Sequence, residues 1–239
     1  MDNLLDQQHN GYTKAVTRDF FKNVYAYMFL ALAISGGIAY YVGSSEEIFA
    51  SYFFNEAGKI SPVFYVVMFA PLGVSLLIQS AYRRLSMVAL TALFILYSAL
   101  IGLMLSTIFM VYSTQSIAVT FFVTAGAFAG MAILGFTTKT DLTKMGSLLY
   151  MAFIGIFIAC IVNLFMKSDQ LDYIISFIGV FVFTGLTAFW MQKLKNVSQD
   201  PMLDGVEKQK LSLVGGLTLY ILFINLFLML LRFTGGSRD

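Results

Sequence analysis

The chain has 239 residues, of which 59% are hydrophobic and only 12% are charged, and its formal net charge at pH 7 is +2. Soluble domains carry about a quarter charged residues, so this composition excludes a water-soluble globular protein and indicates an integral membrane protein. The small net charge, without a basic patch of interleaved aromatic residues, also argues against a nucleic-acid partner.

Seven apolar stretches follow one another along the chain. Each is long enough to cross a bilayer as a helix, which takes about 20 residues. None alternates polar and apolar residues with a period of two, as the strands of a membrane barrel do. Because lipid offers the backbone no hydrogen-bond partners, each stretch should form a helix. The predicted membrane helices cover residues 24–42, 62–82, 87–107, 116–136, 146–166, 171–191 and 211–233.

These helices divide the chain into a polar N-terminal tail (1–23), a seven-helix membrane domain (24–233) and a short C-terminal tail (234–239). Lysine and arginine are enriched on the cytoplasmic side of membrane proteins. Of the 15 such residues, eleven lie on the side of the N-terminal tail and the other four lie opposite. The eleven are Lys14, Arg18, Lys22, Arg83, Arg84, Lys139, Lys144, Lys193, Lys195, Lys208 and Lys210. We therefore expect a cytoplasmic N-terminus, an outside C-terminus and a solvated cytoplasmic loop over 192–210.

The predicted helices contain little that could carry chemistry. None of the 13 carboxylates falls in the middle third of a predicted helix, so a proton relay or a carboxylate-lined cation site has no evident residues. His9 and Cys160 are the only residues of their types, which excludes a histidine triad, a multi-histidine metal site and a disulfide framework within one chain. We expect no enzyme activity, no cofactor and no bound metal.

Uncharged polar residues within the helices are the remaining candidates for lining a pore. They are Gln79, Asn163, Thr187, Thr218 and Asn225. Most such residues form hydrogen bonds between helices, each stabilising by about 0.6 kcal/mol on average. A pore-lining role is the alternative for each of them.

Small residues predict where membrane helices meet, because these helices associate by close packing. The expected contact points are Gly36, Gly37, Gly126, Gly130, Gly215 and Gly216. For Gly126 and Gly130, whose spacing is also found in helix dimers, we expect packing within the bundle, with dimerisation as the alternative.

Four segments of the chain, taken together, carry a specific resemblance. They are FFKNVYAYMFLALAISG (20–36), GFTTKTDLTKMGS (135–147), GVFVFTGLTAFWMQKLK (179–195) and LTLYILFINLFLMLLR (217–232). In this order they resemble segments of the Bax inhibitor-1 family, also called transmembrane Bax-inhibitor-motif proteins, in its bacterial branch. The resemblance covers nearly the whole chain. It implies an all-α seven-helix membrane bundle in which two three-helix layers surround a central C-terminal helix.

Members of this family resemble slow calcium leak channels gated by pH, in which an aspartate late in the sixth helix pairs with one in the seventh. Two carboxylates that share a proton change charge near neutral pH. This chain differs at both positions, where the family pattern places Trp190 and Leu222. Trp190 either anchors its helix at the membrane surface beside Lys193 or packs inward against Leu222 as an apolar plug. We prefer the inward packing, because losing both carboxylates leaves no buried unpaired charge.

The resemblance therefore implies a channel-like protein, a calcium leak without the paired-aspartate pH sensor, which is closed or insensitive to pH. Its permeant partner would be the calcium ion. The alternative is a membrane interaction protein that modulates other membrane proteins, such as a membrane-bound protease, since some bacterial relatives resemble such regulators. Both hypotheses place the chain in the bacterial cytoplasmic (inner) membrane as a multi-pass protein in contact with lipid.

Overall fold

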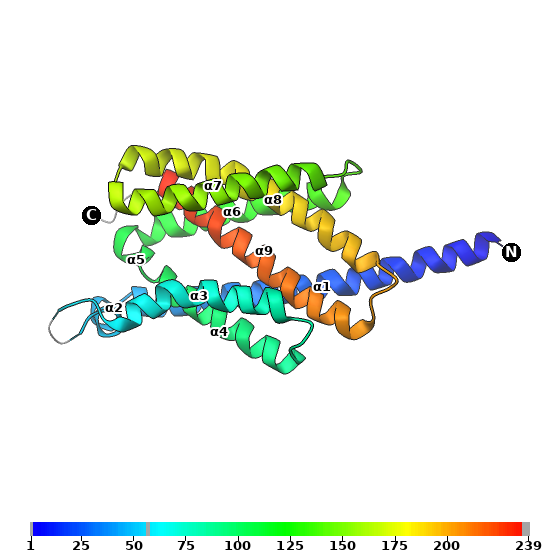
Figure 1. The fold of residues 1–239 in the computed structure, drawn as a ribbon, viewed down its shortest axis with the longest axis horizontal. Coiled ribbons are helices and arrows are strands. Elements are labelled where there is room, and N and C mark those ends of the chain that lie inside the picture. Colours follow the sequence, from blue (N-terminus) through cyan, green and yellow to red (C-terminus); the bar gives the residue numbers. More distant parts are fainter. Residues whose placement is uncertain (1, 56–57, 236–239) are drawn as a thin grey trace. The chain divides into compact units, whose positions relative to one another are not determined.

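Figure 1 shows the computed structural model of the chain, which describes residues 2–55 and 58–235, with side chains from residue 14 onward. The helices are α1 (Asp2–Gly43), α2 (Glu46–Phe53), α3 (Pro62–Ala81), α4 (Met87–Leu105), α5 (Ile108–Val111), α6 (Thr114–Thr137), α7 (Thr143–Met166), α8 (Asp169–Gln199) and α9 (Gly205–Thr234). Seven stretches within them are long and apolar enough to cross a membrane. These seven coincide with the predicted spans, so the all-α membrane fold is confirmed.

The helix ends differ from the prediction where the chain is polar. α1 begins at Asp2, so its helix runs through the predicted tail 1–23. α8 continues to Gln199 and α9 begins at Gly205, so the prediction of a loop over 192–210 is wrong. Lysine, glutamine and glutamate are good helix formers, and a helix that leaves the membrane can continue through them. In the predicted tail 234–239, α9 ends at Thr234, and residues 236–239 lie outside the described residues.

The helices group into two units, each containing three of the first six spans. The first unit holds α1 to α5 together with Ser198–Tyr220, and the second holds α6, α7, α8 as far as Val197, and α9 from Ile221 onward. α9 therefore contributes one half to each unit. α9 is also the most buried of the seven spans, since 72% of its 18-residue apolar stretch is buried, against 6% of the corresponding stretch in α7. This burial agrees with the central C-terminal helix that the resemblance implies.

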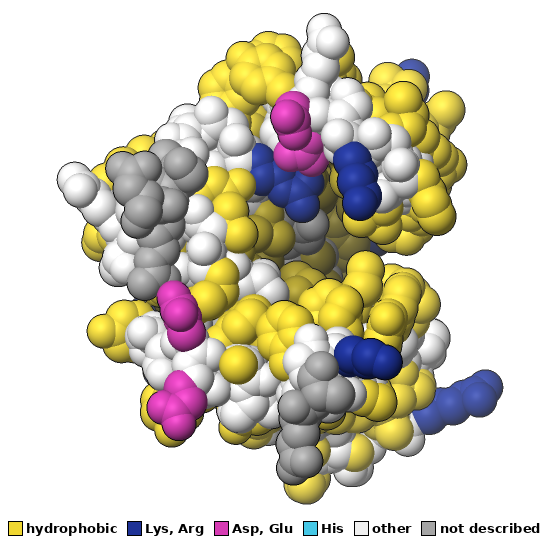
Figure 2. All heavy atoms as spheres, turned by 90° about the vertical axis from the view of Figure 1, so that its left-hand side faces the viewer, with side chains coloured by type: hydrophobic (Ala, Val, Ile, Leu, Met, Phe, Trp, Pro, Cys, Tyr) yellow, Lys and Arg dark blue, Asp and Glu magenta, His cyan; other side chains and the backbone are white. Residues whose placement is uncertain are grey.

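Apolar side chains cover much of the surface, as expected for helices that face lipid. Figure 2 shows one end of the molecule, where a few separate acidic and basic side chains lie among hydrophobic ones. Phe122 and Phe165 are 74% and 84% exposed. In water such exposure would leave large apolar areas hydrated, whereas lipid tails are as apolar as these side chains.

Helices approach most closely at glycines. A Cβ added at Gly102 of α4 would lie 2.8 Å from the backbone oxygen of Ser35 in α1. A Cβ added at Gly216 of α9 would lie 2.7 Å from the backbone oxygen of Val24, also in α1. The predicted contact at Gly216 is therefore confirmed, and both positions let two backbones meet without a side chain between them.

Other glycines that the sequence singled out do not mark contacts. Nothing lies within 4 Å of a Cβ added at Gly126 or Gly130 of α6, and both residues are exposed. The prediction that these two pack within the bundle is wrong, because they lie on the side of α6 that faces away from its neighbours. A Cβ added at Gly36 or Gly37 of α1 would also meet no atom within 4 Å among the described residues.

Candidate functional site

α8 and α9 carry the two residues at the gate-equivalent positions, and they pack against each other within the second unit. A Cβ added at Gly179 of α8 would lie 2.8 Å from both Cγ and Sδ of Met229 in α9. The missing side chain at Gly179 therefore makes room for Met229. A connection of a few residues joins the two helices, so they run antiparallel past this contact.

Helix periodicity predicts that Trp190 and Leu222 lie on the facing surfaces of these helices. Trp190 follows Gly179 by eleven residues, about three turns, so the two share one face of α8. Leu222 precedes Met229 by seven residues, about two turns, so these two share one face of α9. Along the helix axes, Trp190 is about 6 Å farther from this contact than Leu222. Because helical side chains lean toward the N-terminus of their own helix, these two lean toward each other.

Helix periodicity also places Leu186, a residue that the sequence pattern did not single out, opposite Leu222. It follows Gly179 by seven residues, so it lies at the same depth as Leu222 on the facing side of α8. Leu186 is 2% exposed and Leu222 is 5% exposed. The spacing of four residues from Trp190 could have indicated Leu186, since residues one turn apart share a helix face.

The indole of Trp190 is only partly buried and has polar neighbours. Its Nε1 donates a hydrogen bond of 2.7 Å to the Tyr150 hydroxyl in α7, and Nζ of Lys193 lies 4.4 Å from the centroid of its ring. Such contacts are typical of an aromatic residue close to the membrane surface. The indole of Trp190 is thus bound by α7, and only helix periodicity places position 190 on the side of α8 that carries Gly179. A gate formed with Leu222 stays a prediction.

We expect Tyr150→Phe to destabilise the protein by about 1 kcal/mol, because it removes the acceptor of the indole N–H. Trp190 is the only tryptophan, so its fluorescence reports on this site alone and can follow thermal unfolding. Tyr65→Phe is the matched control, since Tyr65 is 54% exposed on α3. Equal unfolding temperatures for the two variants would contradict the contribution of this hydrogen bond.

The polar candidates are bound locally. The side chains of Thr187, Thr218 and Asn225 each donate to the carbonyl oxygen four residues earlier in the same helix, at 2.8, 2.9 and 2.8 Å. Asn163 accepts from the backbone N–H of a residue just beyond α7, at 3.0 Å, and Gln79 is exposed on α3. Hydrogen bonds between helices were expected for most of them, and for these three donors that prediction is wrong. A pore-lining role stays untested.

Two side chains near the end of α8 hold the connection between α6 and α7. Gln192 accepts from the backbone N–H of Leu142 at 2.9 Å and donates to the carbonyl oxygen of Thr140 at 2.8 Å. Nζ of Lys195 donates to the carbonyl oxygen of Phe136 at 2.9 Å. Phe136 lies in the last turn of α6, where the negative end of the helix dipole stabilises a cation. These bonds tie α8 to the end of α6 and to the α6–α7 connection within about one and a half turns of Trp190.

The same connection carries an exposed carboxylate, Asp141. It accepts from the hydroxyl of Thr143 at 2.6 Å and from its backbone N–H at 2.9 Å, and these bonds hold the pKa of Asp141 below its usual range. The N-cap residue of α7 is Leu142, whose side chain makes no capping hydrogen bond, so Asp141 lies one residue before the cap and binds the first residue of the helix. Within residues 2–55 and 58–235, no three His, Cys, Asp or Glu residues are placed to hold a metal ion.

Comparison with known proteins gives one consistent result. A family model described as "Inhibitor of apoptosis-promoting Bax1" matches residues 17–239. The chain is 42% identical to the "Inner membrane protein YbhL" of Escherichia coli K12 over 226 residues, which is 94% of each chain. It is 42% identical to an uncharacterized protein of Borreliella burgdorferi, covering 94% of each chain. It is 41% identical to the uncharacterized protein RP147 of Rickettsia prowazekii, covering 93% of this chain and 91% of that one.

Proposed function

This chain belongs to the Bax inhibitor-1 family of membrane proteins, and we propose that it is a channel-like member whose calcium path is sealed and insensitive to pH. The seal consists of Leu222 on α9 with Leu186 and Trp190 on α8. The protein acts in the inner membrane of a bacterium, with its N-terminus in the cytoplasm and its C-terminus outside.

The burial of Leu222 opposite another leucine carries this proposal. Leu222 and Leu186 are almost completely buried, and the offset of Trp190 by one turn lets its ring lean toward the same depth. An apolar constriction excludes water and with it a hydrated ion. None of the three side chains changes its charge between about pH 6 and 8, so the seal has no group that could open it there.

We therefore expect slow calcium entry into proteoliposomes that contain the purified protein, with less than about a twofold change between pH 6 and 8. Entry would be followed with a trapped calcium dye, with protein-free liposomes as the lower reference and a calcium ionophore as the upper one. A flux that rises several-fold with pH would reject a seal without titrating groups. A flux close to that of the ionophore at every pH would reject the seal itself.

A further inference from the structure

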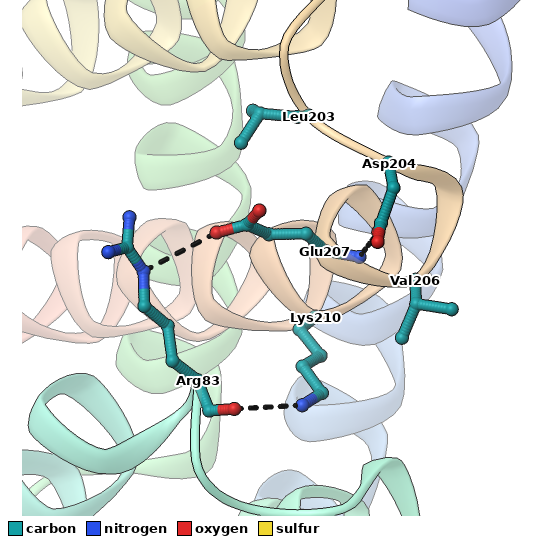
Figure 3. A pocket seen from close by; sticks show the side chains of 6 residues that line it. All are labelled: Arg83, Leu203, Asp204, Val206, Glu207 and Lys210. Carbon is teal, nitrogen blue, oxygen red and sulfur yellow. Dashed lines mark hydrogen bonds and ion pairs between the residues drawn. The ribbon is translucent and has the colours of Figure 1, made fainter.

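A cavity lies at the start of α9, within the first unit. Its volume is about 450 Å³, and it is lined by Arg83, Leu203, Asp204, Val206, Glu207 and Lys210. In Figure 3, Arg83 extends from the α3–α4 connection, and the other side chains belong to the first turns of α9 and the residues before it. Cavities of this volume lie within the range of about 300–1,000 Å³ that small ligands occupy.

The cavity lies where two membrane helices end. Arg83 is two residues beyond the last residue of α3, and Lys210 directly precedes the apolar stretch of α9 that begins at Leu211. Basic residues at such positions lie at the depth of lipid headgroups. Val206, which is 62% exposed, adds an apolar surface beside these charges, as a ligand with both a charged and an apolar part requires.

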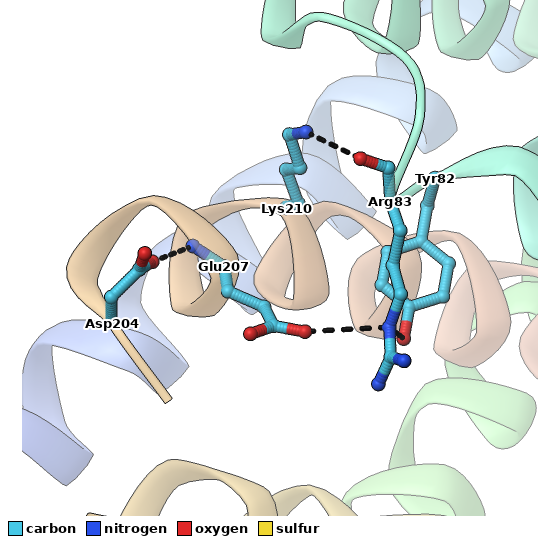
Figure 4. A network of polar contacts seen from close by, with 5 residues as sticks. All are labelled: Tyr82, Arg83, Asp204, Glu207 and Lys210. Atoms are coloured by element: carbon cyan, nitrogen blue, oxygen red, sulfur yellow. Dashed lines mark hydrogen bonds and ion pairs between the residues drawn. The ribbon is translucent and has the colours of Figure 1, made fainter. Parts of the chain in front are cut away.

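The lining carries two cations and two carboxylates that are already partly paired. Nε of Arg83 lies 3.4 Å from Oε1 of Glu207, and Nζ of Lys210 donates to the carbonyl oxygen of Arg83 at 3.2 Å. Asp204 accepts from the backbone N–H of Glu207. Figure 4 shows these contacts in one network, in which the Tyr82 hydroxyl also lies beside Arg83. The network brings the cations and the carboxylates together at the cavity, while the Arg83 side chain stays largely exposed.

Each ion in this network keeps capacity for a further partner. The side-chain contacts of Arg83 within the described part of the chain use Nε, and its two terminal nitrogens are further donors. Lys210 uses one donor of three, and Glu207 presents a second carboxylate oxygen. The pKa of Arg83 is raised, first by the hydrogen bond to Tyr82 and also by the charge of Glu207, so this cation is permanent.

We propose that this cavity binds the headgroup of a zwitterionic phospholipid, one in which a phosphate is followed by a primary ammonium group. The phosphate accepts hydrogen bonds from Arg83 and Lys210, and the ammonium donates to Glu207. A ligand with only negative charge fits less well, because the carboxylates of Asp204 and Glu207 balance the two cations. The position at the ends of α3 and α9 favours a lipid over a free phosphate compound, since the acyl chains stay in the bilayer.

The proposal is tested by the lipids that the purified full-length protein retains in native mass spectrometry, after equal exposure to three phospholipids. We expect phosphatidylethanolamine to be retained about tenfold more than phosphatidylcholine, whose methylated ammonium has no N–H to donate. Phosphatidylglycerol, which has no ammonium, should also be retained less. Equal retention of all three, or a preference for phosphatidylglycerol, would overturn the proposal.

Variants separate the cavity from general attraction to the membrane surface. Arg83→Gln and Glu207→Gln should each reduce the retention of phosphatidylethanolamine about tenfold. Arg84→Gln is the matched control, since Arg84 is exposed, adjacent and not part of the cavity. Circular dichroism confirms that each variant is folded. An equal loss for Arg83→Gln and Arg84→Gln would assign the effect to surface charge and overturn the site.

A soluble competitor identifies the source of the headgroup. Free phosphoethanolamine carries the same phosphate and ammonium without acyl chains, and at equal concentration it should displace less than a tenth of the bound lipid. Complete displacement would mean that the cavity takes a soluble compound rather than a lipid. Calcium flux does not enter any of these measurements, so the result is independent of the proposed channel.

Discussion

A Trp190→Asp, Leu222→Asp double variant should gain a calcium flux that increases several-fold between about pH 6 and 8. The two positions lie on facing surfaces of α8 and α9 in the second unit, about one turn apart along the axes, and their side chains lean toward each other. Two carboxylates placed there share one proton at low pH, and one pKa of the pair is raised. As the pH rises through that pKa the pair ionises, and the constriction becomes wet and attractive to cations.

The single variants are controls with a large expected effect of their own. Leu222 is 5% exposed, so Leu222→Asp alone buries a carboxyl group without a partner and should destabilise the protein by about 3–5 kcal/mol. Trp190→Asp alone should cost less, because Trp190 is only partly buried. The double variant should be more stable than the sum of the single costs predicts, since two interacting residues are not additive. Unfolding temperatures in detergent measure all three.

Two results would show which residues form the constriction. If the double variant folds and its flux does not depend on pH, then Trp190 and Leu222 do not act on one another. A Leu186→Asp, Leu222→Asp variant provides the comparison, because these positions share one depth while their side chains lean apart. A pH-dependent flux in that variant and not in the first would place the constriction at Leu186.

The membrane spans could be predicted from the sequence because hydropathy is decided locally. A stretch such as 146–166 is predominantly apolar and carries no charge, and lipid leaves it no conformation other than a helix. The end of α8 is different, because 192–199 is polar and hydropathy reads it as a loop. Its residues include good helix formers, and its helix is also held by the bonds of Gln192 to the α6–α7 connection and of Lys195 to the end of α6, which hydropathy does not report.

The candidate site divides in the same way. The family pattern in the sequence singles out Trp190 and Leu222, and the packing of Gly179 on Met229 supports their facing positions. The role of Leu186 and the hydrogen bond from Trp190 to Tyr150 depend on the depth of one helix relative to another. The depth of one helix relative to its neighbour is set by which side chains interdigitate, so the sequence of one helix alone does not predict it. The side chains of Thr187, Thr218 and Asn225 do not donate hydrogen bonds to other helices, because the carbonyl oxygen one turn earlier in their own helix is always within reach.

Gly135→Ala should be among the most destabilising small substitutions in the second unit. A Cβ at this position of α6 would overlap the backbone of Ala188 in α8, its carbonyl oxygen above all. Backbone atoms cannot rotate away as a side chain does, so the two helices must separate. Overpacking of this kind costs about 1–3 kcal/mol, and separation would also stretch the nearby bond from Lys195 to Phe136.

Gly130→Ala is the matched control for this prediction, because it makes the same chemical change on the same helix with nothing within 4 Å of the new Cβ. Alanine is a better helix former than glycine, so Gly130→Ala should leave the unfolding temperature unchanged or raise it slightly. Gly135→Ala should lower it by roughly 5–10 °C, followed by the fluorescence of Trp190. Equal shifts for both variants would mean that α6 and α8 do not meet at Gly135. A fall for Gly135→Ala alone would establish that contact, which places α6 beside the α8 segment that carries Leu186 and Trp190.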